Sequence, residues 1–222
     1  MKFKYLLFIF SFYVCSFVFA ADPILAKSQT FNAAQKITKA VFLYEERNVD
    51  VNVQTNYNPL AFSDPLSLNS RRAYLGDTGF PAFGDLLVSA AAKSFSELGV
   101  LVIHSGYAPE GRLKDYERDL ADQLGAEIQN TIKIVVTPTS ASTSGHATGS
   151  SVKVSFSVEI VNSQTQNKIW VGEVLTSTHT GKGFISKNLF PGQIYDQTYA
   201  ESIFKLLAAN WRKAGLLQRV PS

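Results

Sequence analysis

Sulfur is almost absent from this chain of 222 residues, in which Met1 and Cys15 are the only methionine and the only cysteine. Both lie within the first twenty positions. The rest of the chain therefore cannot form a disulfide, a thiolate metal site or an iron–sulfur cluster, and it cannot supply a cysteine nucleophile.

An excess of one charge is lacking as well. Once Lys2 and Lys4 are set aside, nineteen basic residues remain against 18 acidic ones. A surface for nucleic acid needs a clustered basic excess. The composition therefore excludes a broad electrostatic footprint, and we expect no nucleic-acid partner.

The amino terminus is typical of a secretory signal peptide. Lys2 and Lys4 precede an apolar run from Tyr5 to Ala20 that is short for a membrane-spanning helix. The run ends in Val18-Phe19-Ala20, which predicts cleavage before Ala21. We therefore predict a signal peptide over residues 1–20 and a single periplasmic domain over residues 21–222.

Cys15 offers an alternative, because it could be the acylated cysteine of an outer-membrane lipoprotein. It follows Phe12-Tyr13-Val14, whereas the lipoprotein protease favours a small residue before the cysteine. The sequence therefore favours the periplasmic form, with membrane association only if Cys15 is lipidated.

Hydrophobic periodicity in the first half of the domain predicts extended segments followed by a helix. Residues 39–44 form a short apolar run, and residues 48–54 alternate valine with polar side chains. Residues 57–81 are rich in turn formers and predict a long irregular connection. An apolar stripe then predicts a helix over 85–98, ended by Gly99.

The second half alternates between strand and helix signals. Residues 100–104 are apolar on both faces, which predicts a strand in the middle of a sheet. A leucine stripe predicts a helix over 112–124, with an i,i+4 ion pair between Arg118 and Asp122. Further strands are predicted at 131–137, 152–160 and 168–178. The Ser/Thr-rich tract 138–151 is typical of a flexible loop. A last helix is predicted over 198–214.

These signals predict one α/β (α+β) domain. Strand-helix-strand units favour parallel neighbours, and the short polar turn at 162–167 requires an antiparallel hairpin. We therefore expect a mixed sheet of about five to six strands with three helices, in which the carboxy-terminal hairpin is followed by a packed helix.

The order of elements and two phrases carry a resemblance to a known family. The phrases are Leu120 to Glu127 before a β run, and the hairpin Val158 to Val161 with Lys168 to Gly172. The chain resembles a group of bacterial envelope proteins that includes the curli-secretion channel protein CsgG, the TolB amino-terminal domain, the penicillin-binding-protein activator LpoB and the Pel-polysaccharide lipoprotein PelC. The resemblance covers residues 38–215 and implies a domain that binds other proteins, often within an export or cell-wall machine.

Catalytic and metal-binding patterns are not found. His104, His146 and His179 are too far apart in sequence for a local ligand pair. Ser144-Gly145-His146 lies in a low-complexity tract, and no G-x-S-x-G elbow occurs. The sequence therefore predicts no catalytic residue, no metal site, no cofactor and no enzymatic activity.

Carboxylates gather on the helix predicted over 112–124. They are interleaved with Lys114 and Arg118, opposite the leucine stripe, so a solvated helix face is favoured over an acid/base pair. The carboxylates are Asp115, Glu117, Asp119 and Asp122.

The long connection carries the candidate interaction surface. Aromatic and arginine side chains, which protein interfaces enrich, are dense in it. They are Tyr57, Phe62, Arg71, Arg72, Tyr74 and Phe80. The alternative is that the rings pin the connection against the core.

Three classes of function follow from the sequence. The favoured one is a non-enzymatic exported accessory of bacterial envelope assembly or export that contacts envelope proteins or a second copy of itself. A peptidoglycan- or exopolysaccharide-binding module is the alternative. An enzyme comes third, and a pocket joining His104 to a carboxylate would support it.

Overall fold

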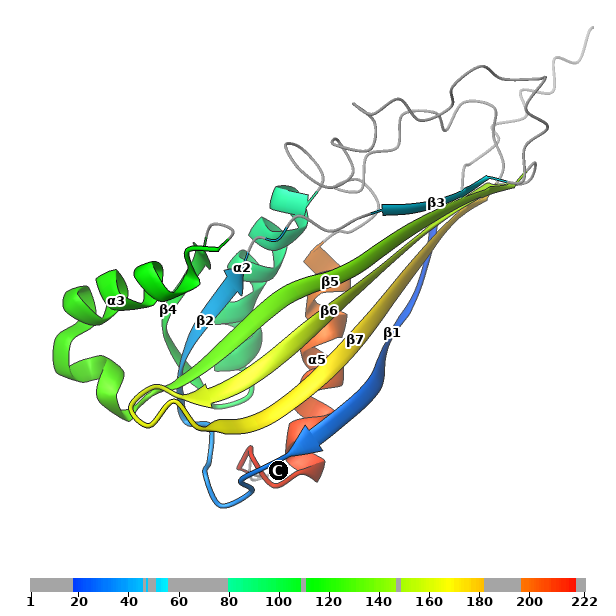
Figure 1. Cartoon of the computed structure of the whole chain (residues 1–222). Coiled ribbons are helices and arrows are strands. Elements are labelled where there is room, and N and C mark those ends of the chain that lie inside the picture. The colour runs from blue at the N-terminus through cyan, green and yellow to red at the C-terminus, as the bar shows by residue number, and fades with distance from the viewer. Residues whose placement is uncertain are drawn as a thin grey trace, which may run out of the picture.

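The computed structural model describes residues 18–45, 47, 51–55, 80–108, 111–146, 149–181 and 197–218. Within them lie seven strands of one sheet, three α-helices and one 3₁₀ helix (Figure 1). The strands are β1 (Val18–Thr30), β2 (Lys39–Glu45), β3 (Val51–Thr55), β4 (Leu101–Ala108), β5 (Ile132–His146), β6 (Gly149–Asn162) and β7 (Lys168–Gly181). The helices are α2 (Phe80–Ser96), α3 (Leu113–Leu124), η1 (Gly125–Asn130) and α5 (Gln197–Lys213).

The sheet is mixed, with the strand order β1-β7-β6-β5-β2-β4, and β3 pairs with β5 beside this path. From β1 to β5 each pair is antiparallel, whereas β2 runs parallel to both β5 and β4. β2 is buried on both faces because its centre is continuously apolar: Ala40 to Leu43 are 0% exposed. It is the strand around which the helices are arranged.

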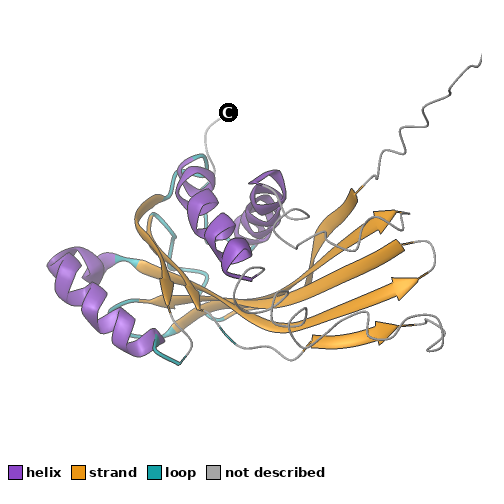
Figure 2. Cartoon of the chain, turned by 90° about the horizontal axis from the view of Figure 1, so that it is seen from above, coloured by secondary structure: helices purple, strands orange, loops and turns teal. Residues whose placement is uncertain are grey.

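Helices α2 and α5 cover one face of the sheet, here called the inner face (Figure 2). The main core lies there. Phe95 of α2 and Phe204 of α5 meet Phe42 of β2, with ring centroids 5.1–6.1 Å apart. Trp211 of α5 stacks on Phe95 and meets Trp170 of β7 edge to face.

Helix α3 lies on the opposite face, here called the outer face, and packs near β2 and β4 (Figure 2). Its contact is small: Leu120 meets Val41 and Leu43, the side chains of β2 that point away from the main core. Over β6, β7 and β1 no helix of the described residues covers the outer face.

The predicted fold class is confirmed. The structure has one α/β domain with a mixed sheet and three α-helices within the described residues, and the β6–β7 hairpin precedes the last helix. The carboxy-terminal ends of α2 and α5 lie close to the predicted ones as well. Gly99 and Gly215 both have φ of 75°, and the amides of Val100 and Leu216 bind the carbonyls of Phe95 and Trp211, as in Schellman caps.

One strand was not predicted. β1 pairs antiparallel with β7 and forms an edge of the sheet, although its sequence has no strict alternation. Its first three pairs, from Val18 to Ala20, precede the predicted cleavage site before Ala21. Cleavage there would remove three of the ten residue pairs between β1 and β7.

The position of β4 was predicted wrongly. It is the other edge of the sheet, and Leu101 at its start is 62% exposed. The apolar side chains that suggested a central strand are divided between the two faces: Val102 packs on the main core, and Ile103 packs against the cluster under α3.

The predicted flexible loop at 138–151 is also wrong. β5 continues to His146 and β6 begins at Gly149, so this tract forms most of a long antiparallel ladder, with β3 alongside β5. Main-chain pairing on both sides of β5 satisfies the backbone without apolar side chains, which is why composition misled the prediction. α2 likewise begins at Phe80, five residues before the predicted start, because Pro81 is tolerated in a first helical turn.

Candidate functional site

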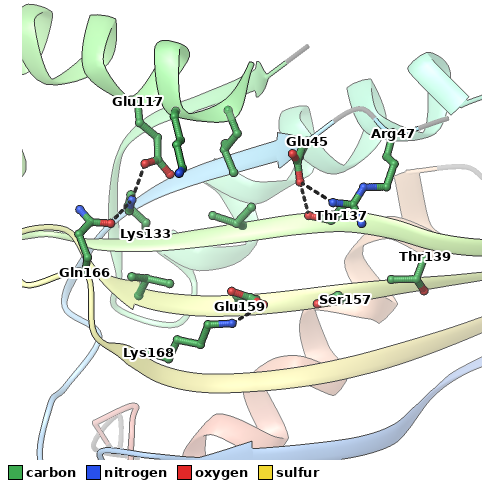
Figure 3. A pocket seen from close by; sticks show the side chains of 14 residues that line it. Glu45, Arg47, Glu117, Lys133, Thr137, Thr139, Ser157, Glu159, Gln166 and Lys168 are labelled. Carbon is green, nitrogen blue, oxygen red and sulfur yellow. Dashed lines mark hydrogen bonds and ion pairs between the residues drawn. The ribbon is translucent and has the colours of Figure 1, made fainter. Parts of the chain in front are cut away.

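The outer face carries a hollow of about 350 Å³ between α3, the end of β2 and the β6–β7 turn (Figure 3). We call it the trough. Valine side chains of β5 and β6 contribute apolar surface, and polar and charged groups surround them. The lining residues are Glu45, Arg47, Leu113, Lys114, Glu117, Lys133, Val135, Thr137, Thr139, Ser157, Glu159, Val161, Gln166 and Lys168.

Lys133 is the most deeply buried charge of the trough, with 6% of its side chain exposed. Its Nζ lies 2.7 Å from Oε2 of Glu117 on α3 and donates a hydrogen bond of 2.8 Å to Oε1 of Gln166 in the β6–β7 turn. The strand, the helix and the turn are therefore held together by one ammonium group, and the cost of burying it is offset by two charge-assisted contacts.

The other two carboxylates of the trough also have partners. Thr137 donates a hydrogen bond of 3.0 Å to Glu45, and Lys168 lies 2.9 Å from Glu159 (Figure 3). Arg47 approaches Glu45 only to 3.9 Å, with 53% of its side chain exposed. Every carboxylate of the trough therefore has a partner from within the protein.

Lys114 on the first turn of α3 differs from the other trough cations. Among the residues that the structure describes it has neither an ion pair nor a hydrogen bond, and it is exposed. Together with the weakly engaged Arg47, it leaves positive charge available at the trough.

A second feature of the outer face is an exposed apolar pair. Ile24 of β1 is the register partner of Leu175 on β7, and these residues are 61% and 39% exposed. Their neighbours Leu25 and Val174 point to the main core, so Ile24 and Leu175 point away from it. We call these two side chains the apolar patch.

His104 and Tyr116 form a separate contact between β4 and α3. Nε2 of His104 lies 2.9 Å from the hydroxyl of Tyr116. Gly106 lies beneath them, where a Cβ would clash with both polar atoms. Burial lowers the pKa of His104 and raises the pKa of Tyr116.

We expect His104 to make stability depend on pH. Because its pKa is lowered on folding, the unfolded chain binds more protons, and stability falls as the pH is lowered through the ordinary value of 6.5. His104→Gln keeps a hydrogen-bonding group but cannot titrate. In urea unfolding at pH 7.5 and 5.0, the wild type should lose more stability than the variant, and parallel pH profiles would contradict the assignment.

Five of the six residues of the predicted interaction surface are not described, so that surface stays a prediction. Tyr57, Phe62, Arg71, Arg72 and Tyr74 lie outside the described residues, and Phe80 begins α2. His146 lies in β5 and His179 lies in β7.

Two predictions about the charged residues of α3 differ from the structure. Glu117 faces the trough and binds Lys133, so it does not belong to a solvated face. Arg118 lies 3.2 Å from Asp115, not in the predicted pair with Asp122. The missed residue is Lys133, and a single lysine between Ile132 and Ile134 in a buried strand is the signal that could have indicated it.

Within the described ranges no three metal-ligating side chains gather, and no helix there is long and apolar enough to cross a membrane. The chemistry that the outer face offers is binding: an apolar patch, hydroxyls, and a trough with available positive charge.

No known protein family and no curated protein matches the chain in sequence. Solved structures are similar to it in fold. A PelC dodecamer from Paraburkholderia phytofirmans has 14% identity and a TM-score of 0.41, covering 89% of this chain and 99% of PelC. Lipoprotein GNA1162 from Neisseria meningitidis has 18% identity and a TM-score of 0.32, covering 77% of this chain and 99% of the lipoprotein.

The carboxy-terminal domain of LpoB from Salmonella enterica is a third similar structure, with 16% identity and a TM-score of 0.21, covering 65% of this chain and 86% of that domain. PelC and LpoB are two of the proteins that the sequence resembles. The structural similarity assigns no residue of this chain a role.

Proposed function

We propose that this protein is a non-enzymatic, exported accessory of bacterial envelope assembly or export that acts by binding other proteins through its outer face. The observation that carries the proposal is the apolar patch. Ile24 and Leu175 lie side by side on the part of the outer face that no described helix covers, at 61% and 39% exposure. A partner that covers this face would remove both apolar side chains from water, which favours association.

The amino-terminal residues and the charge composition support two other parts of the proposal, export and a partner that is not nucleic acid. The signal-like residues 1–20 favour export, and the near-balance of charge disfavours nucleic acid. The partner is an envelope protein or a second copy of the chain. The aromatic segment from Tyr57 to Phe80 stays a prediction of a further contact region.

A polysaccharide-binding module is the second candidate, and the polar side chains of the trough favour it. Hydroxyls of Thr137, Thr139 and Ser157 and the amide of Gln166 line it beside carboxylates, and such groups suit sugar hydroxyls. None of the described lining residues is aromatic, however, so the trough offers no ring on which a sugar could stack. Protein contact is therefore favoured.

Capture from the native envelope tests the proposal. Ile24→Asp with Leu175→Asp should lower the recovery of co-purifying protein, or self-association in sedimentation, at least tenfold, because each buried apolar anchor contributes about 1.5–3 kcal/mol. The melting temperature should hardly change, since both positions are exposed.

Leu101→Asp is the matched control, because Leu101 is 62% exposed on the opposite edge of the sheet. Equal losses with Leu101→Asp, or full binding by the double variant, would contradict the proposal. Recovery of peptidoglycan or exopolysaccharide in place of protein would favour the second candidate.

A further inference from the structure

From the charges of the trough we infer that it binds an acidic peptide segment of the protein partner, and this inference rests on the proposed function. The trough contains four cationic side chains and three carboxylates among its described lining residues. The excess of one cation does not by itself identify a ligand. The ligand depends on which of these charged groups already have an ion pair or a hydrogen bond within the protein.

The carboxylates of the trough are engaged from within the protein. Glu117 lies 2.7 Å from Lys133, Glu159 lies 2.9 Å from Lys168, and Glu45 accepts the hydroxyl of Thr137 at 3.0 Å. A cationic ligand would compete with Lys133 at Glu117 and with Lys168 at Glu159, and only Glu45, which accepts from a neutral hydroxyl, has no ammonium group beside it. The trough is therefore poorly suited to an incoming positive charge.

Two cations of the trough, Lys114 and Arg47, have weaker contacts than the carboxylates or none. Lys114 has no ion pair or hydrogen bond within the described part of the chain, and Arg47 lies 3.9 Å from Glu45, beyond hydrogen-bond length. An incoming carboxylate could meet both groups without breaking an existing hydrogen bond. The charge that remains available to a ligand is positive.

The surroundings of these two cations favour a peptide. Leu113, Val135 and Val161 supply apolar surface between the charged groups, which suits the methylene groups of glutamate side chains. The threonine and serine hydroxyls of the trough can donate or accept hydrogen bonds with a peptide backbone. The lining described above has no aromatic ring, which disfavours an acidic polysaccharide.

The test uses the mature protein and a fluorescein-labelled hexaglutamate peptide, with binding measured by fluorescence anisotropy. Hexalysine and a neutral Gly-Ser peptide serve as comparison probes, and oligogalacturonate as a competitor. Hexaglutamate should bind more tightly than either comparison peptide, with an affinity that falls as salt is raised, because the contacts are exposed charges.

Lys114→Gln with Arg47→Gln should raise the dissociation constant for hexaglutamate about tenfold, since it removes both cations that remain available to a carboxylate. The matched control is Arg212→Gln with Lys213→Gln, which removes two exposed cations from the end of α5 on the other side of the sheet. The control should stay within about twofold of the wild type.

Three results would overturn the inference: equal weakening by the control, binding of hexalysine at least as tight as that of hexaglutamate, or tighter binding of oligogalacturonate. Failure here is separable from failure of the proposed function. If envelope protein is still lost from Ile24→Asp with Leu175→Asp while hexaglutamate does not bind, only the chemistry assigned to the trough is wrong.

Discussion

Trp211→Ala should lower the free energy of unfolding by about 3–5 kcal/mol, the usual cost when a buried aromatic side chain leaves a cavity. Trp211 is 0% exposed. Its ring stacks on Phe95 with centroids 5.7 Å apart and meets Trp170 at the same distance with an interplanar angle of 86°. The substitution therefore removes contacts among α2, α5 and β7 at once.

Trp211→Phe provides the informative comparison. The indole Nε1 of Trp211 is buried and has no hydrogen-bond partner in the described structure. Phenylalanine keeps an aromatic ring in the core and removes this unpaired donor. We expect it to cost less than about 2 kcal/mol in urea unfolding, whereas a loss below about 1 kcal/mol for Trp211→Ala would show that the ring is not part of the core.

Glu117→Ala should cost about 3 kcal/mol, because it leaves the ammonium of Lys133 buried without its carboxylate. The side chain of Lys133 is 6% exposed and its Nζ lies 2.7 Å from Glu117. Lys133→Met together with Glu117→Leu removes both charges and should restore stability to within about 1 kcal/mol of the wild type, since an apolar pair can replace a buried ion pair.

The pair Glu159 and Lys168 is the control for this prediction. Its atoms are 2.9 Å apart, but its side chains are 34% and 52% exposed, so Glu159→Ala should cost less than about 1 kcal/mol. Urea unfolding of the four proteins gives the comparison. A double variant that is no more stable than Glu117→Ala would show that the pair is not a buried unit.

Much of the fold could be predicted because local patterns and tertiary packing agree there. In β6, Val154, Phe156, Val158 and Ile160 alternate with polar residues, and all four are buried against the helices. The apolar stripe of α5 predicted a packed helix for the same reason, and its buried face includes Phe204, Leu207 and Trp211. In each element the apolar residues recur with the period of that element, two residues for the strand and about 3.6 for the helix. This pattern alone was sufficient to predict which face is buried.

The failures arose where strand pairing, not side-chain pattern, determines the structure. β1 is defined by its ladder with β7, and the Ser/Thr-rich tract from Pro138 becomes strand because β3 and β6 pair with it. Such long-range hydrogen bonds leave little trace in local composition.

The candidate site was missed for a related reason. Lys133 and Glu117 were assigned separately to an apolar strand and to a solvated helix face. Their contact requires α3 to lie on the outer face of the sheet within reach of β5, and the packing of Leu120 on Val41 and Leu43 holds the helix there. The apolar patch likewise depends on β1, because Ile24 meets Leu175 only through that strand.

Site-specific photocrosslinking in the native organism tests the contact role of the outer face most directly. A photoreactive residue at position 175 should form a discrete crosslinked species with an envelope protein or a second copy of the chain. The same residue at position 205, an exposed lysine of α5 on the other side of the sheet, should form none. Crosslinks from position 205 alone, or from neither position, would contradict the account.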